Sequence, residues 1–373
     1  MSDGKDKRDE RITGNKGEWS EFYVLLRLLA DGRLYAADKD INKIPDSFFD
    51  ILQILRTEND NLLRTYKIED KQKNVVLYIN GDKWNTISRQ ELDAEARYLL
   101  SKIQDGGRSS FPIDRADEIM GELECKIIKA KNTDKADIRM IIHDSFSGLE
   151  TKVGFSIKSE LGAPPTLLNA SPATNFRYAL PDAKTDEDAA AINGIQTRNK
   201  IQERVRAAGQ MIPKGCNNET FRDNLMLVDS RMPEIVGWML LLSYKNNVTE
   251  CYKLAAMLEE KNPLGYSIEH NSRKNNRPSI YTYKIKKLLA AFALGMMPNA
   301  PWSGIEEASG GYIIVKTDGD VVAYHLYNRN EFESYLFNNT RLERASTSRH
   351  HYAEVYKDGD DYCMNLNLQI RFI

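Results

Sequence analysis

The sequence is poor in cysteine, and the spacing of its cysteines excludes two common ways of stabilising small domains. Cys125, Cys216, Cys251 and Cys363 are the four cysteines of the 373 residues, and no two of them form a CxxC pair. Neither a structural zinc site nor a disulfide framework is expected. A chain of this length buries a full hydrophobic core without such staples, as one large or two medium domains. So few thiols fit a reducing, cytoplasmic location.

Long apolar runs, an excess of one charge and several familiar motifs are also missing. No window approaches the roughly eighteen apolar residues of a membrane-spanning helix, so no membrane partner is expected. Residues 1–17 are polar and lack the apolar core of a signal peptide. The 52 basic and 54 acidic residues nearly cancel, so a nucleic-acid site would have to appear as local clustering. There is no P-loop, no GxGxxG after a strand, no GxSxG and no HExxH.

The chain alternates helix and strand signals. Residues 1–13 read as a mobile tail, and EWSEFYVLLRLLA then predicts a helix that begins near Glu18 and stops at Asp31-Gly32. The segment 44–58 looks helical. Further helices are predicted at 88–104 and 233–260, and further strands at 33–38, 74–81, 310–327 and 350–373.

The most informative segment is 137–161, DIRMIIHDSFSGLETKVGFSIKSEL. Folding it about Ser147-Gly148 as an antiparallel hairpin gives one wholly apolar face, made of the facing pairs Ile138–Ile157, Met140–Phe155 and Ile142–Val153. In this register Asp137 faces Lys158 on the other side of the hairpin. A carboxylate and an ammonium then meet at one end of a half-buried hairpin.

That arrangement is typical of PD-(D/E)xK nucleases. In them the aspartate ligates Mg²⁺ beside the scissile phosphate, and the lysine orients and helps to deprotonate the attacking water or stabilises the transition-state charge. Ser156 occupies the position two residues before Lys158 where a second carboxylate normally lies, and it would contribute a hydrogen bond behind the metal ligands. The alternative is a solvated cross-strand ion pair without a catalytic role.

A second acid has to come from elsewhere, and Glu18 and Glu160 are the leading candidates. Glu18 precedes Phe22 and Leu25 at helical spacing and therefore points toward the buried side, where a carboxylate is costly unless it is paired or metal-bound. Glu160 lies on the same strand face as Lys158. Glu21 aligns with buried-type leucines too, but the favoured interpretation is a first-turn charge stabilised by the helix dipole, and that interpretation is open for Glu18 as well.

Three segments are candidates for DNA contacts. The clearest basic patch is 270–287, with two interleaved tyrosines, and 338–351 adds arginines suited to guanine edges. The loop that follows the hairpin carries short hydrogen-bonding side chains. For all three, a solvated surface segment without DNA contact is the alternative. The residues concerned are Arg273, Lys274, Arg277, Lys284, Lys286 and Lys287, then Arg341 and Arg349, and finally Asn169 and Asn175.

At these residues the sequence resembles the HpaII family of type II restriction endonucleases. The resemblance runs through GNKGEWSEFY, LADGRLYAAD, DIRMIIHD, GFSIKSELGAPPTLLNASPATNF, KIKKLLAAFALGMMPNAPW, GGYIIVKTDGDVVAYHLYNR and NLQIRF. It implies Mg²⁺-dependent cleavage of double-stranded DNA at CCGG, between the two cytosines, and a companion cytosine methyltransferase that protects host DNA. Carried over by position, the catalytic hairpin falls on Asp137, Ser156 and Lys158.

These observations predict an α/β protein with a PD-(D/E)xK core, a mixed sheet flanked by helices. The catalytic region is expected over 14–232, and a helical, then β-rich region that grips the DNA over 233–373. A palindromic target suggests a homodimer on DNA. The rival functions are a structure-directed repair nuclease of the same fold and a DNA-binding protein whose hairpin has lost its metal.

Overall fold

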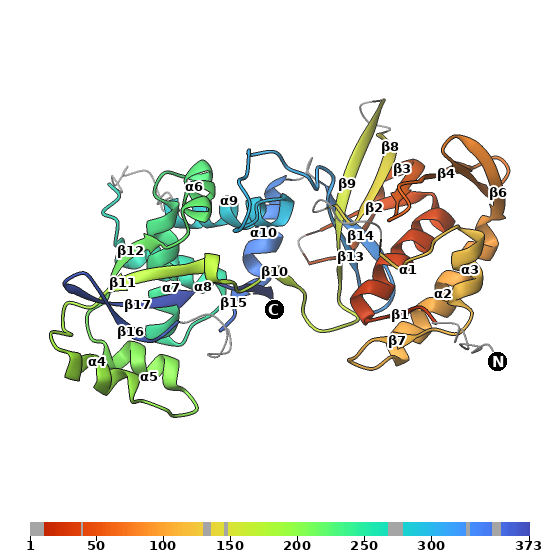
Figure 1. The fold of residues 1–373 in the computed structure, drawn as a ribbon. Helices are drawn as coiled ribbons and strands as arrows, with labels where there is room; N and C mark the ends of the chain where they lie inside the picture. The colour runs from red at the N-terminus through yellow and green to blue at the C-terminus, as the bar shows by residue number, and fades with distance from the viewer. Residues whose placement is uncertain are drawn as a thin grey trace, which may run out of the picture. The chain divides into compact units, whose positions relative to one another are not determined.

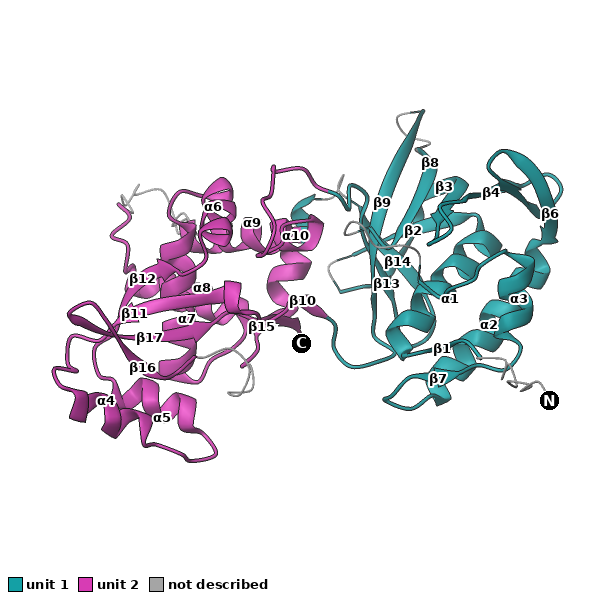
Figure 2. Cartoon of the chain, viewed as in Figure 1, with its two compact units in different colours: residues 1–165, 307–332 teal, residues 166–306, 333–373 magenta. Residues whose placement is uncertain are grey.

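The computed structural model describes residues 11–38, 40–129, 136–144, 148–267, 279–325, 329–344 and 352–373 (Figure 1). The chain divides into two compact units (Figure 2). Unit 1 comprises residues 1–165 and 307–332, and unit 2 comprises residues 166–306 and 333–373. The boundary expected after residue 232 falls inside unit 2, and the separate catalytic and gripping roles of the two regions stay predictions.

Unit 1 is built on a nine-stranded mixed sheet in the order β2-β14-β13-β9-β8-β3-β4-β5-β6. Strand β2 also pairs with β3, so β2, β14, β13, β9, β8 and β3 form a closed, barrel-like ring, which the sequence did not predict. The elements of unit 1 are β1 (Thr13–Gly14), α1 (Lys16–Asp31), β2 (Arg33–Ala37), β3 (Lys43–Thr57), β4 (Leu63–Glu69), β5 (Asn74–Ile79), β6 (Asp82–Ser88), α2 (Arg89–Asp105), β7 (Phe111–Pro112), α3 (Ala116–Glu122), β8 (Ile138–Asp144), β9 (Leu149–Ser159), β13 (Gly311–Val315) and β14 (Val321–His325).

Helix α1 confirms the helix predicted near the N-terminus and lies at the centre of the unit 1 core. Asn15 caps it, accepting hydrogen bonds from the backbone N–H groups of Gly17 and Glu18, and Gly32 ends it in the left-handed conformation at φ 65°. Its apolar face includes the fully buried Trp19 and Phe22 and packs into a core shared with α2 and the sheet. The helix therefore presents its remaining side chains at a fixed place beside the sheet.

The helix predicted over 44–58 is wrong, because the segment forms the long strand β3. The reason is a β-bulge in its pairing with β8, between Ile51 and Gln53. Buried residues alternate at Phe49 and Ile51, then resume at Ile54 after the bulge. The extra residue gives Ile51 and Ile54 the three-residue spacing of a helix face, although the backbone is extended.

The predicted hairpin forms as β8 and β9, but its register differs by two residues from the expected one. Ile138 pairs with Phe155 and Met140 with Val153, and the last pair is Asp144 with Leu149. A shift of two residues preserves the alternation of faces, so the apolar face is confirmed and buried as expected. The hydrophobic pattern cannot distinguish the two registers, and Asp137 consequently lies opposite Ser156 rather than Lys158.

Strands β13 and β14 confirm the hairpin predicted after Gly310, but they belong to the same sheet as β8 and β9. Strand β13 runs parallel to β9, with Ile314 opposite Lys158, and β14 runs parallel to β2. Gly311 has φ 104°, and a Cβ there would lie 2.0 Å from the Tyr324 carbonyl oxygen. Only glycine fits this close approach of the two strands.

Unit 2 combines helices with two smaller sheets, in the orders β12-β11-β17-β16 and β10-β18-β15. The helical prediction for 233–260 is confirmed as two helices, α7 and α8, separated after the left-handed Asn247. The elements of unit 2 are β10 (Thr166–Leu168), the 3-10 helix η1 (Pro172–Thr174), β11 (Asn175–Ala179), α4 (Asp186–Asn193), α5 (Lys200–Ala207), β12 (Ile212–Cys216), α6 (Glu219–Val228), α7 (Met232–Asn246), α8 (Cys251–Lys261), α9 (Ile280–Leu294), β15 (Thr340–Leu342), β16 (Val355–Asp358), β17 (Asp361–Asn367) and β18 (Ile370–Phe372). Helix α10 (Arg329–Asn338) begins in unit 1 and ends in unit 2. No helix within the described ranges is both long and apolar enough to span a membrane.

Candidate active site

Asp137 lies immediately before β8 and is held by β9. Its backbone N–H donates to the Phe155 carbonyl oxygen at 2.8 Å. Its Oδ2 accepts hydrogen bonds from the Ser156 hydroxyl at 3.0 Å and from the Ile157 N–H at 2.7 Å. Two donors on one oxygen fix the orientation of the carboxylate. Ser156 is almost fully buried, so its hydroxyl holds Asp137 from within the protein.

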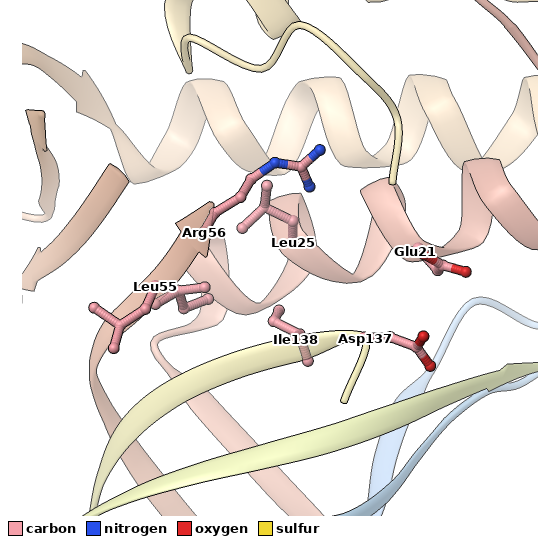
Figure 3. A pocket seen from close by; sticks show the side chains of 7 residues that line it. Glu21, Leu25, Leu55, Arg56, Asp137 and Ile138 are labelled. Carbon is pink, nitrogen blue, oxygen red and sulfur yellow. The ribbon is translucent and has the colours of Figure 1, made fainter. Parts of the chain in front are cut away.

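Glu21, on α1, is the second carboxylate at this place. Figure 3 shows Glu21 and Asp137 extending in the same direction at one small cavity. The cavity has a volume of about 20 Å³ and is lined by Glu21, Leu25, Ile54, Leu55, Arg56, Asp137 and Ile138. The Glu21 side chain is 13% exposed, and its Oε2 is buried without a hydrogen-bond partner among the residues that the structure describes. Burial, and then the negative charge of Asp137, raise the pKa of Glu21 to about 7.

Lys158 completes the group. It directly follows Ile157, whose N–H holds Asp137, and its ammonium lies 5.2 Å from the centre of the Tyr312 ring. Its positive charge lowers the pKa of Glu21, against the larger effects of burial and Asp137. The structure thus gathers two carboxylates and a lysine in one place, although Asp137 and Lys158 are not opposite each other in the strand register.

The pair of carboxylates fits a small divalent cation. A cavity of about 20 Å³ holds a single water-sized sphere. The buried, unpartnered Oε2 of Glu21 is an oxygen in need of a donor or a cation. Mg²⁺ prefers oxygen ligands, and one or two carboxylates suffice because waters and substrate phosphates complete its shell. Among the described residues no group of three or more histidines, cysteines or acids gathers as a metal cluster.

The two acids favoured by the sequence take other positions. Glu18 closes a capping box at the start of α1, where its Oε2 accepts from the Asn15 N–H at 2.8 Å. This is the first-turn role that the sequence offered as the alternative for Glu18, and it engages one of the two carboxylate oxygens. Glu160 is exposed just beyond the end of β9. Glu21, which the sequence analysis interpreted as a first-turn charge, lies past the first turn beside Asp137.

The three lysines of α9 that were candidate DNA contacts have partners within unit 2. Lys284 pairs with Asp229, Lys287 Nζ lies 2.7 Å from Glu333 Oε1, and Lys286 Nζ donates to the Ser334 hydroxyl at 3.1 Å. The lysine side chains of the two ion pairs are at most 30% exposed. These contacts favour a structural role, because charges already paired and partly buried are poor phosphate ligands. Arg273, Lys274, Arg277 and Arg349 lie outside the described residues.

The other candidate DNA contacts differ in their exposure to solvent and in their partners. Asn169 is exposed, as a contact residue must be. Asn175 is 6% exposed, and its Oδ1 accepts from Asn367 Nδ2 at 2.7 Å, so it belongs to a buried hydrogen-bond network. Arg341 is half-exposed on β15 and lies directly opposite Arg371 of β18. Glu343 is near both guanidinium groups, at 3.2 Å from Arg341 and 3.7 Å from Arg371. One carboxylate thus lies between the two arginines.

Comparison with known proteins identifies the family. The family model described as HpaII restriction endonuclease matches residues 15–372. The chain is 37% identical over 366 residues to the type II restriction enzyme HpaII of Haemophilus parainfluenzae, covering 98% of this chain and 99% of that enzyme. No solved structure matches. The paired carboxylates and lysine thus lie in a chain that belongs to the HpaII family of type II restriction endonucleases, which are site-specific deoxyribonucleases.

Proposed function

We propose that this enzyme cleaves double-stranded DNA at CCGG, between the two cytosines, with Mg²⁺ held by Asp137 and Glu21. The match to HpaII over nearly the full length of both chains supports the specificity. The observation that carries the metal site is the buried, unpartnered Oε2 of Glu21 beside Asp137 in a cavity of about 20 Å³. This is the site of a PD-(D/E)xK nuclease in which the second acid comes from a helix.

Each side chain then has one task. Ser156 and the Ile157 N–H hold Oδ2 of Asp137, so Oδ1 would be the oxygen with which Asp137 holds the cation. Helix α1 brings in Glu21, and the charged Lys158 would orient the attacking water and stabilise the negative charge that develops on the phosphate. A bound Mg²⁺ supplies positive charge for the scissile phosphate and acidifies a bound water.

A digest tests the proposal. Unmethylated plasmid DNA with Mg²⁺ should give discrete fragments whose ends, when sequenced, all derive from CCGG. Asp137→Asn and Glu21→Gln should each lower the cleavage rate at least about 100-fold while DNA binding survives, because each removes a charge that acts on the transition state. The matched control is Glu160→Gln, an exposed acid near the end of β9, which should cleave as the unaltered enzyme does. Full activity of Glu21→Gln would remove Glu21 from the site, and cleavage at another sequence would overturn the specificity.

A palindromic target also indicates which partners the enzyme has. Two strands must be cut at symmetric positions, so we propose that two copies of the chain act together on the DNA as a homodimer. A companion cytosine methyltransferase would protect the host, and its gene is expected next to this one. DNA methylated at CCGG should resist the enzyme. Because the enzyme has to reach DNA in the cytoplasm, we expect it to be located there.

A further inference from the structure

A pair of buried, oppositely charged residues anchors the backbone that leads to Lys129. Arg56 and Glu58, at the end of β3, are 8% and 1% exposed, and Arg56 Nε lies 2.8 Å from Glu58 Oε1. Arg56 also donates to the Ile128 carbonyl oxygen at 3.1 Å. Glu58 Oε2 accepts from the Lys126 N–H at 2.9 Å. The segment is therefore fixed to the sheet at two points just before Lys129.

From this anchored segment, Lys129 reaches the candidate active site. Its Nζ lies 2.9 Å from Oε1 of Glu21, while the other oxygen, Oε2, has no hydrogen-bond partner within the described ranges. Burial opposes the charge of Lys129, but Glu21, and then Asp137 and Glu18, outweigh burial and raise the pKa of Lys129. The side chain is 41% exposed, so the ammonium is free to turn toward solvent.

We propose that Lys129 is a further active-site residue, the counter-ion that a divalent metal displaces from Glu21. This inference rests on the proposed metal site. The ammonium already holds one of the two oxygens of Glu21, so a metal that uses both carboxylates has to move it or bind against its positive charge. The displaced ammonium needs a new anion within reach of its side chain.

The phosphate backbone of bound DNA supplies that anion. A lysine ammonium is a point charge with three donors on a flexible stem, suited to move between a carboxylate and a phosphate oxygen. DNA binding therefore makes it easier for Lys129 to leave Glu21, and the metal binds more tightly when DNA is present. By linkage, the metal strengthens DNA binding by the same factor. Lys129 thus couples the two ligands, so that the metal site fills mainly when there is a bond to cut.

Calorimetric titration with Ca²⁺ measures this coupling without relying on turnover. The full-length enzyme and Lys129→Met are titrated alone and in complex with a short duplex that contains one CCGG. The matched control is Lys126→Met, since Lys126 belongs to the same segment but pairs with Asp60 at 3.2 Å instead of Glu21. Without DNA, Lys129→Met should bind Ca²⁺ about five- to tenfold more tightly than the unaltered enzyme, since a half-buried ion pair no longer competes. Its affinity should gain less from the duplex, and the control should match the unaltered enzyme in both titrations.

The outcomes separate the two proposals. Unaltered or weaker Ca²⁺ binding by a folded Lys129→Met, while the unaltered enzyme binds both ligands, would overturn the role of Lys129 and leave the metal site intact. If the unaltered enzyme binds no Ca²⁺ even with the duplex, the metal site itself fails. Circular dichroism and the melting temperature of each variant exclude misfolding. A second variant, Lys129→Arg, keeps the charge and should restore the dependence of metal binding on DNA.

Discussion

The raised pKa of Glu21 makes the metal-free fold sensitive to pH in a way that one substitution removes. In the unfolded chain the carboxyl has an ordinary pKa of 4.5, and in the folded chain burial and then Asp137 raise it to about 7. The folded state therefore binds the proton more tightly than the unfolded state. The protonated Glu21 side chain therefore makes its full contribution to the stability of the folded state below pH 4.5, and this contribution is lost as pH rises through about 7. A difference of one in pKa corresponds to about 1.4 kcal/mol. The charged form of Glu21 therefore destabilises the folded state by about 3 kcal/mol above pH 7.

Glu21→Gln removes this titration and keeps the shape of the side chain. Urea denaturation of both proteins in EDTA gives the difference in unfolding free energy at each pH, in which the titrating groups that do not interact with Glu21 cancel. The variant should gain up to about 3 kcal/mol over the unaltered enzyme between pH 4 and pH 8, with most of the change between pH 4.5 and 7. A difference that stays constant across this range, or that favours the unaltered enzyme at pH 8, would refute the placement of Glu21 in a dry site beside Asp137.

Two further predictions concern the framework around the site. Glu58→Ala leaves the buried Arg56 guanidinium without its carboxylate and should destabilise the fold by about 3–5 kcal/mol in urea denaturation, and a loss below about 1 kcal/mol would contradict the buried pair. Gly311→Ala should be less stable than Gly81→Ala by a further ~1–3 kcal/mol, because both glycines have positive φ but only at Gly311 does a Cβ meet a backbone carbonyl oxygen. Equal melting temperatures for these two alanine variants would show that the clash is relieved by movement of the strands.

Local signals predicted much of the fold, and long-range pairing accounts for what they missed. Asn15 and Gly32 delimit α1 through caps that involve only neighbouring residues, so its bounds are readable from the sequence. The bulge near Ile51 depends on the partner strand β8. In the sequence itself it is visible only as a three-residue spacing of apolar side chains, which resembles that of a helix. Closure of the ring depends on the pairing of β13 with β9 and of β14 with β2, between segments far apart in the chain. No periodicity within one segment carries that information.

The candidate site was predicted in part for the same reason. Asp137 and Lys158 follow from the alternating faces of one hairpin, which survive a two-residue error in register. Glu21 aligns with the leucines of a buried helix face, and the general preference of acids for helix N-termini led to its interpretation as a first-turn charge, although it lies past the first turn of α1. Lys129 had no signal at all, because its position is set by the contacts that Arg56 and Glu58 make with a segment distant in sequence.

The order in which the ring strands occur along the chain has a consequence for biosynthesis. Strands β13 and β14, residues 311–325, are translated after residues 166–306 of unit 2, yet they complete the sheet of unit 1. A nascent chain therefore cannot finish the sheet of unit 1 until most of the polypeptide has left the ribosome. Products of premature termination before Gly311 lack the strand that flanks Lys158, so an aborted copy of this restriction enzyme is not expected to assemble the candidate site.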